Sequence, residues 1–197
     1  MVADLRKACR EIDARIRSGD LLVVKNPGVK TKVAERSIDL MLRESAEPLV
    51  CVSVEHKTIM TAHGKARKNR YGDIIAYCNH MHNHRKECIA AAIVIVNTSP
   101  LYQNPDAFAR GLVRPNYKME RVVASTVSIF DGIPLREAAD EPNDQPEALA
   151  VIVVSYDGVR PAALVDYLPD GSRIRYHAFI QRISTLYMER FGLSRLR

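Results

Sequence analysis

Long apolar runs are missing from this sequence of 197 residues. The longest, at residues 89–96 and 148–154, are far shorter than the roughly 20 residues that a membrane-spanning helix needs. The first seven residues mix acids with bases and contain no apolar h-region, which argues against a secretory signal. We therefore expect a cytoplasmic protein that has no membrane partner.

Cysteine is scarce, and the common phosphate-binding and hydrolase motifs are absent. The four cysteines (Cys9, Cys51, Cys78 and Cys88) sit at unrelated spacings without a C-x-x-C pair, so we expect buried free thiols. The sequence contains no G-x-x-x-x-G-K-[ST], no G-x-S-x-G and no strand-loop-helix G-x-G-x-x-G. It therefore predicts neither a P-loop nor a nucleophile elbow nor a dinucleotide-binding turn.

Composition is that of an ordinary folded domain. Hydrophobic residues make up 47% and charged residues 26%, and there is no repeat or convincing linker, so residues 1–197 are expected to form one domain. The 29 Lys and Arg exceed the 23 Asp and Glu, which gives a net charge of +6 and a pI near 9.2. This excess is compatible with a polyanionic partner such as DNA but does not require one.

Hydrophobic periodicity predicts an α/β fold. Residues 3–17 and 64–84 show helical spacing, whereas residues 21–24, 33–43, 49–59 and 89–96 show strand patterns. We expect residues 33–43 and 49–59 to form an antiparallel hairpin and residues 89–96 to form a strand buried on both faces. The order helix, strand, hairpin, helix, strand predicts a mixed central sheet flanked by helices.

The second half of the chain is predicted in less detail. Helices are expected at residues 105–112, 119–130 and 173–191, and strands at 148–154 and, at a sheet edge, 162–167. Residues 135–147 hold acids, prolines and an Asn-Asp pair, which indicates an exposed loop.

Three charged residues of the predicted hairpin stand out. Glu55 and Lys57 lie two apart on one strand, so their side chains leave the same face of the sheet. If the turn centres on Ala46, Asp39 faces Ser53 and shares that face, whereas a slip of one residue would send Asp39 to the other side. Two carboxylates beside an ammonium suit a Mg²⁺ site, because Mg²⁺ takes hard oxygen ligands and phosphate oxygens while Lys57 orients or deprotonates a water.

This segment resembles the PD-(D/E)xK phosphodiesterase superfamily, which includes restriction endonucleases, phage exonucleases and Holliday-junction resolvases. The resemblance rests on Ser37-Ile38-Asp39-Leu40 followed by Val52-Ser53-Val54-Glu55-His56-Lys57 and a basic helix. It implies a restriction-endonuclease-like αβββαβ core over about residues 3–97, with Asp39 and Glu55 as metal ligands and Lys57 as the lysine of the motif. Ile38 replaces the usual proline, and His56 occupies the variable position.

Further residues are assigned by their position around this hairpin. Glu11, on the first helix, is a candidate auxiliary metal ligand, since many members of the superfamily add an acid there. Lys65, Arg67, Lys68 and Arg70 crowd the first turns of the helix after the strand and are candidate phosphate contacts, although such residues also form ordinary solvated helix faces. The C-terminal half would supply specificity or dimer-forming elements.

The histidines near residue 82 raise two alternative sites, a ββα-metal nuclease site and a zinc site. The letters H-N-H at 82–84 do not predict a ββα-metal nuclease, because that site needs histidines on a hairpin and on a following helix. His80, His84 and Cys88 make three zinc ligands without a fourth at the usual spacing, so histidines near a helix C-terminus are the simpler explanation.

The sequence therefore predicts a Mg²⁺-dependent DNA endonuclease of restriction type, acting as a homodimer. A repair or recombination nuclease on the same scaffold is the closest rival. A nucleic-acid-binding protein that has lost the chemistry is another, and an unrelated α/β protein with a surface Glu-x-Lys ion pair is a third.

Overall fold

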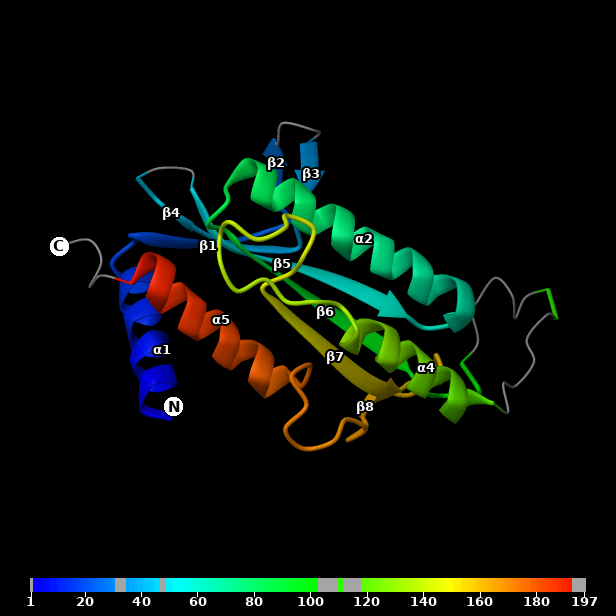
Figure 1. The fold of residues 1–197 in the computed structure, drawn as a ribbon. Helices are drawn as coiled ribbons and strands as arrows, with labels where there is room; N and C mark the ends of the chain where they lie inside the picture. Colours follow the sequence, from blue (N-terminus) through cyan, green and yellow to red (C-terminus); the bar gives the residue numbers. More distant parts are fainter. Residues whose placement is uncertain (1, 31–34, 47–48, 103–109, 112–117, 193–197) are drawn as a thin grey trace.

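The computed structural model describes residues 2–30, 35–46, 49–102, 110–111 and 118–192, and it confirms an α/β architecture built on a mixed sheet (Figure 1). The six-stranded sheet has the order β1-β4-β5-β6-β7-β8. These strands are β1 (Leu21–Lys25), β4 (Leu40–Glu44), β5 (Val50–Ile59), β6 (Ile89–Asn97), β7 (Ala148–Ser155) and β8 (Ala163–Leu164). In the part of the chain just specified, no helix has the length and apolarity needed to span a membrane.

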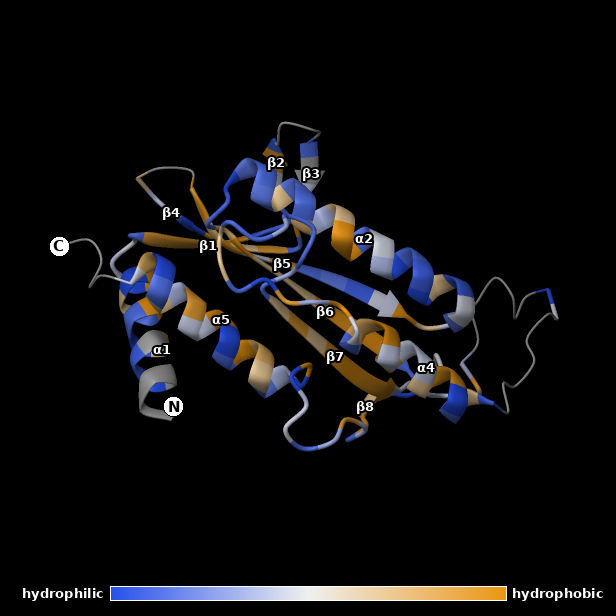
Figure 2. Cartoon of the chain, viewed as in Figure 1, coloured by the Kyte–Doolittle hydropathy of each residue, from blue (hydrophilic) through white to orange (hydrophobic). Residues whose placement is uncertain are grey.

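Strand direction changes across this sheet. Strand β4 runs antiparallel to β1 and β5, whereas β5, β6 and β7 are mutually parallel and β8 closes the edge antiparallel to β7. The parallel strands β6 and β7 are almost entirely apolar (Figure 2), as expected for strands covered on both faces. The continuous aliphatic pattern thus gave the correct prediction for residues 89–96 and 148–154.

Helices cover both faces of the sheet. The four described helices are α1 (Val2–Arg17), α2 (His63–His84), α4 (Met119–Asp131) and α5 (Tyr176–Phe191). On one face, Tyr77 of α2 and Phe130 of α4 pack with Val94 of β6. On the other, Phe179 of α5 packs with Ile93, and α1 lies against α5 and β1. Consecutive residues of β6 thus pack into the cores on opposite faces of the sheet, because side chains alternate along a strand.

The predicted strand at residues 33–43 is wrong as a single element. The chain instead forms a short ribbon of β2 (Gly28–Lys30) and β3 (Glu35–Ser37), then bends before β4 begins at Leu40. Ile38, fully buried, donates its amide to the carbonyl of Pro27 and so fixes the base of this ribbon. Burial of Ile38 outweighs the strand propensity of its neighbours, and Asp39 is left at the bend.

The hairpin of β4 and β5 forms, but in a register two residues from the expected one. Met41, not Asp39, pairs with Ser53, and the ladder shifts at Leu42 and Arg43. The shift there is a β-bulge or a similar irregularity, in which one strand carries an extra residue and the simple turn count fails. Because two is an even number, Met41 stays on the α2 face together with its partner Ser53, whereas Asp39 precedes β4 and its face is not fixed by the ladder.

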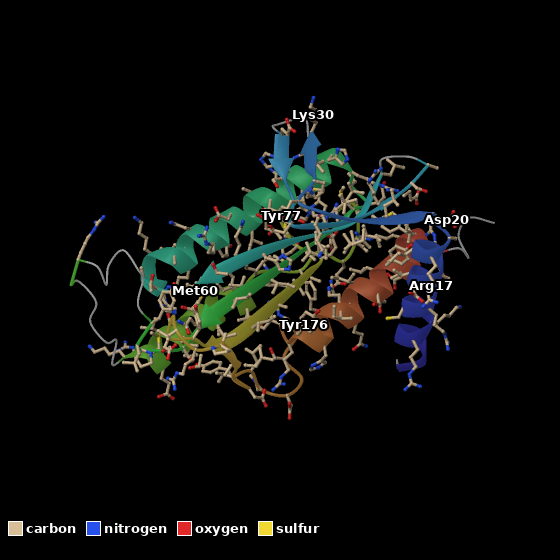
Figure 3. The ribbon with its side chains drawn as sticks, turned by 180° about the vertical axis from the view of Figure 1, so that it is seen from behind. Arg17, Asp20, Lys30, Met60, Tyr77 and Tyr176 are labelled. Atoms are coloured by element: carbon tan, nitrogen blue, oxygen red, sulfur yellow. The ribbon has the colours of Figure 1, made fainter. Side chains whose placement is uncertain are left out.

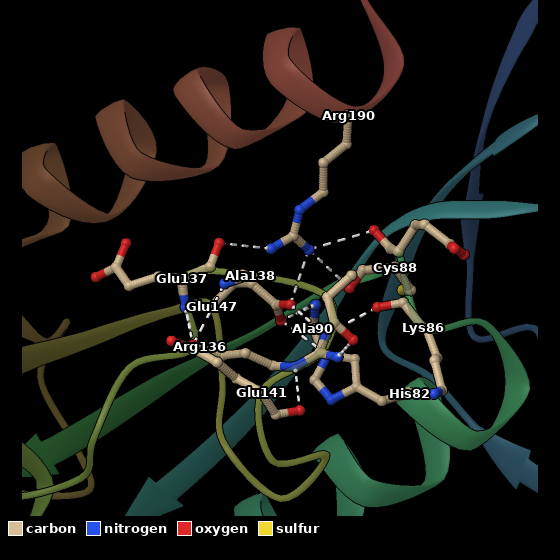
Figure 4. A network of polar contacts seen from close by, with 12 residues as sticks. His82, Lys86, Cys88, Ala90, Arg136, Glu137, Ala138, Glu141, Glu147 and Arg190 are labelled. Atoms are coloured by element: carbon tan, nitrogen blue, oxygen red, sulfur yellow. Dashed lines mark hydrogen bonds and ion pairs between the residues drawn. The ribbon is translucent and has the colours of Figure 1, made fainter.

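The expected loop at residues 135–147 forms and is exposed over much of its length, but it also carries two fully buried charged residues. Arg136 and Glu147 are fully buried within it, and they meet His82 of α2 and Arg190 of α5 (Figure 4). The Glu147 carboxylate accepts hydrogen bonds from Arg136 (2.9 Å), Arg190 (2.8 Å) and the amide of Ala90 (2.9 Å). A polar segment can be buried in this way because each charge meets a partner of opposite sign.

The remaining predictions differ in outcome. Helices α1, α2 and α4 match their expected ranges within a residue or two, α5 begins at Tyr176 instead of 173, and the edge strand β8 shrinks to two residues. Most of residues 105–112, where a short helix was predicted, lies outside the described residues. Three of the four cysteines are buried as free thiols, but Cys9 is exposed.

Candidate active site

Asp39 lies where β4 and β5 separate. The last described pair of their ladder is Leu40 with Val54, so continuing this register places Asp39 beside Glu55. Beyond this point the backbone of β4 no longer reaches β5, and the Asp39 Oδ2 atom instead accepts the backbone amide of His56 at 2.6 Å. The same oxygen lies 3.7 Å from Nδ1 of the His56 ring. At this separation of β4 and β5, which we call the fork, the Asp39 carboxylate accepts the hydrogen bond that a neighbouring strand would otherwise accept.

Glu55 and Lys57 form an ion pair on the face that α2 covers. Val54 belongs to the core under α5, so alternation along β5 directs Glu55 and Lys57 to the opposite, α2 side. Lys57 Nζ donates to Glu55 Oε1. Glu55 is only 4% exposed, whereas the side chain of Asp39 is 42% exposed. The site thus combines one buried acid, paired with a lysine, and one accessible acid.

Burial of Glu55 distinguishes this pair from a surface ion pair. A carboxylate loses several kcal/mol of hydration when it is buried, which an exposed ion pair does not. Tyr77 of α2 is also buried at this face (Figure 3), and burial chiefly raises the pKa of its phenol, with smaller contributions from Cys88 and Glu55. The solvated Glu-x-Lys pair considered from sequence is therefore not the arrangement in the folded chain.

The four basic residues of α2 do not share one surface. Arg70 reaches the edge of β5, where its Nε lies 3.4 Å from the carbonyl of Thr58, and its guanidinium also pairs with Asp73 at 2.7 Å. Arg67 turns toward α4 and donates to Ser125. Lys65 and Lys68 are exposed to solvent. Within the described chain, Arg70 is the one of the four with a hydrogen bond to β5, at Thr58, the residue after Lys57.

Glu11 is not placed with Asp39 and Glu55. Helix α1 packs against α5 and β1, on the opposite side of the sheet from α2. There the negative charge of Glu11 helps to raise the pKa of Tyr187, which burial raises first and most, to about 12. The assignment of Glu11 as an auxiliary ligand needed the first helix on the α2 side, so the fold overturns it. Sequence periodicity finds α1 but does not indicate which face of the sheet it covers.

The histidine and cysteine residues considered for zinc are divided between the core and the surface. Cys88 is fully buried and its Sγ lies 3.6 Å from Oγ of Ser53, whereas His84 is exposed at the end of α2. His82, between the two histidines considered, is the buried one: Nδ1 lies 2.7 Å from the carbonyl of Asn143, and Nε2 lies 2.9 Å from Glu147. His82 therefore connects the end of α2 to the C-terminal half.

His56 is the residue at the fork that sequence reasoning left without a role. The resemblance placed it at a variable position, and the pattern of β5 gives no signal that its amide and ring would both meet Asp39. Only the register of β4 against β5 brings these two residues together.

Two acids near the fork carry oxygen donors. Asp39 and Glu55 supply carboxylate oxygens, the ligand type that Mg²⁺ prefers. Oδ1 of Asp39 takes part in none of the hydrogen bonds found among the described residues. No protein-family model, no curated protein and no solved structure matches this chain.

Proposed function

We propose that this protein is a Mg²⁺-dependent DNA endonuclease of restriction-enzyme type, with a PD-(D/E)xK site on a restriction-endonuclease-like core. The observation that carries the proposal is the fork of β4 and β5. Asp39 lies at the bend before β4 and Glu55 lies on β5, and Glu55, the more buried of the two, is paired with Lys57. A buried acid-lysine pair at a strand edge is costly to retain for packing alone, which favours a chemical role.

Each residue has a distinct part in this proposal. Asp39 and Glu55 would hold the Mg²⁺. When bound, this ion polarises a phosphodiester and lowers the pKa of a water. Lys57 would orient the attacking water and offset the negative charge that develops on the phosphate. Arg70, at the carbonyl of Thr58, would contact a neighbouring phosphate, with Lys65, Arg67 and Lys68 as outer contacts.

The wider assignments belong to the same proposal. One domain over residues 1–197, a homodimer that cuts both strands, and a cytoplasmic location accompany the restriction-type assignment. The Glu147 network supports a structural role for part of the C-terminal half, because it ties residues 136 and 147 to the ends of α2 and α5. A repair or recombination nuclease would use the same fork on a different DNA form.

Cleavage of plasmid DNA tests the proposal. The wild-type protein is incubated with supercoiled, linear and single-stranded DNA in the presence of Mg²⁺, Mn²⁺ or a chelator, and the product ends are mapped. Lys57→Met keeps most of the side-chain volume and removes the ammonium, so cleavage should fall by at least about 100-fold, the usual share of a positioned acid-base group. Lys86→Met, at an exposed lysine outside the fork, is the matched control and should cut normally.

Two results would reject the enzyme assignment. Equal cleavage by wild type and Lys57→Met would show that any activity comes from elsewhere. Binding of DNA without cleavage in any metal would favour the catalytically inactive binding protein.

A further inference from the structure

A groove lies between the β2–β3 ribbon and the C-terminal end of α2, separate from the acids at the fork. It holds about 460 Å³. Its apolar surface comes from Val24, Val29, Met41 and Val50, its charged lining comes from Lys30 and Arg43, and His84 also lines it. Lys30 lies at the outer end of the ribbon, which stands out from the body of the molecule (Figure 3).

The two cations of this groove form no ion pair among the described residues, and one acid, Glu35, lies beside the lining residue Gly28. No Asp or Glu of the described ranges is itself a lining residue. Glu35 is the nearest acid on the ribbon, since it pairs across the strands with Lys30. Its carboxylate is directed at Gly28, where an added Cβ would lie 2.9 Å from Oε1. Among the residues that the structure describes, the groove therefore presents two cations without an ion-pair partner beside an apolar floor. Such a surface is complementary to a ligand that carries both an anionic group and apolar edges.

The groove and the candidate active site lie on one face and follow each other along β5. Met41 belongs to the core on the α2 side, the face to which Glu55 also turns, and Met41 pairs with Ser53. At the far end, Arg70 reaches the carbonyl of Thr58. From Ser53 to Thr58 the strand rises by about 17 Å at roughly 3.3 Å per residue, which is about five nucleotide steps of 3.4 Å. Cations thus stand on both sides of Asp39 and Glu55.

We propose that the groove binds the phosphate backbone of a nucleic acid strand, which continues from Lys30 and Arg43 past the fork toward Arg70. This inference rests on the proposed function. It extends that function because it assigns the β2–β3 ribbon as a nucleic-acid-binding element. Lys30 and Arg43 contact phosphates, and the apolar floor receives sugar edges. Phosphate contacts of this kind position a strand without reading its sequence.

Binding is measured without cleavage, by fluorescence anisotropy of labelled single-stranded and duplex oligonucleotides in a chelator over a series of salt concentrations. Each lost phosphate contact should lower the slope of log K against log salt by about 1 and weaken binding roughly five- to tenfold at 0.1 M salt. Lys30→Ala and Arg43→Ala should each show this change, and the double variant should show about twice the change in slope. Lys7→Ala, at an exposed lysine of α1 on the opposite side, is the matched control and should leave the slope unchanged.

Glu35→Gln provides a test that does not depend on loss of binding. Removing this charge beside Lys30 should tighten binding a few-fold and raise the slope, an effect that a damaged fold cannot produce. The single-stranded and duplex arms identify which form the groove accepts.

The outcomes separate the inference from the proposed function. Unchanged slopes in both alanine variants, with normal DNA cleavage by wild type, would overturn the proposed role of the groove and leave the nuclease proposal standing. Reduced slopes in these variants, with no cleavage by wild type in any metal, would reject the nuclease proposal. They would support the groove as the nucleic-acid-binding site of a protein that does not cleave. Equal losses in Lys7→Ala and Arg43→Ala would also overturn the groove, since they would indicate general charge attraction.

Discussion

The carboxylate of Asp39 accepts the backbone amide of His56 at 2.6 Å, at the point where β4 and β5 part. One side chain therefore satisfies a strand amide that has lost its ladder partner, and its second oxygen, Oδ1, is the atom that the proposed metal site would use. Structural and chemical roles of Asp39 can be separated experimentally, because the hydrogen bond needs only an acceptor while metal binding needs the charge.

Asp39→Asn should abolish cleavage and leave the fold intact. The Asn amide oxygen can still accept from His56, so the free energy of unfolding should change by less than about 1 kcal/mol, whereas Asp39→Ala loses the acceptor and should cost about 1–3 kcal/mol. Plasmid cleavage and urea unfolding measure the two effects. Cleavage by Asp39→Asn at the wild-type rate would remove Asp39 from the metal site.

Glu147→Gln should destabilise the chain strongly. Arg136 is fully buried against this carboxylate, and loss of the negative charge leaves its guanidinium uncompensated, at a cost of about 3–5 kcal/mol. Urea unfolding monitored by circular dichroism gives the difference. Glu137→Gln, whose side chain is 65% exposed and pairs with Arg182, is the control and should cost less than about 1 kcal/mol. Equal effects of the two substitutions would contradict the role assigned to the buried network.

The same carboxylate predicts how stability depends on pH. Burial alone would raise the pKa of Glu147, but the hydrogen bonds and charges of His82 and Arg190 outweigh it, so the pKa lies below its usual value of 4.5. A carboxyl group whose pKa is lower in the folded chain stabilises it above the unfolded pKa and loses this contribution as pH falls. The free energy of unfolding should therefore fall more steeply below about pH 5 in wild type than in Glu147→Gln. Parallel pH profiles of the two proteins would count against this assignment.

Thiol reactivity should divide the cysteines into one fast residue and three slow ones. Cys9 is exposed, whereas burial raises the pKa of Cys51 to about 11 and that of Cys88 to about 12, so little thiolate forms at these positions near neutral pH. Titration with a chromogenic disulfide at pH 8 should show one rapid equivalent in the native chain and four in urea. Cys9→Ser should remove the rapid phase, and its persistence would show that another thiol is accessible.

Local sequence patterns predicted most of the elements but not their pairing. Residues 89–96 are aliphatic throughout and could only be a buried strand or helix segment, and the helical stripe of α2 was found within one residue. The single strand expected at 33–43 failed because the burial of Ile38, a tertiary interaction, breaks it into β3 and β4. Likewise the irregular register near Arg43 is not visible in the sequence, because Val50, Cys51 and Val52 are all apolar and hide the interruption of alternation there.

By itself the sequence determined that Glu55 and Lys57 share a face, because alternation along an extended strand is a property of the backbone. Tertiary structure decided the rest: that Asp39 stands at a fork beside His56, that Glu55 is buried beneath α2, and that Glu11 lies across the sheet. The physical reason is the range of the forces involved. Strand geometry acts over neighbouring residues, whereas register, burial and the choice of face depend on segments far apart in the chain, which meet only after the core has formed.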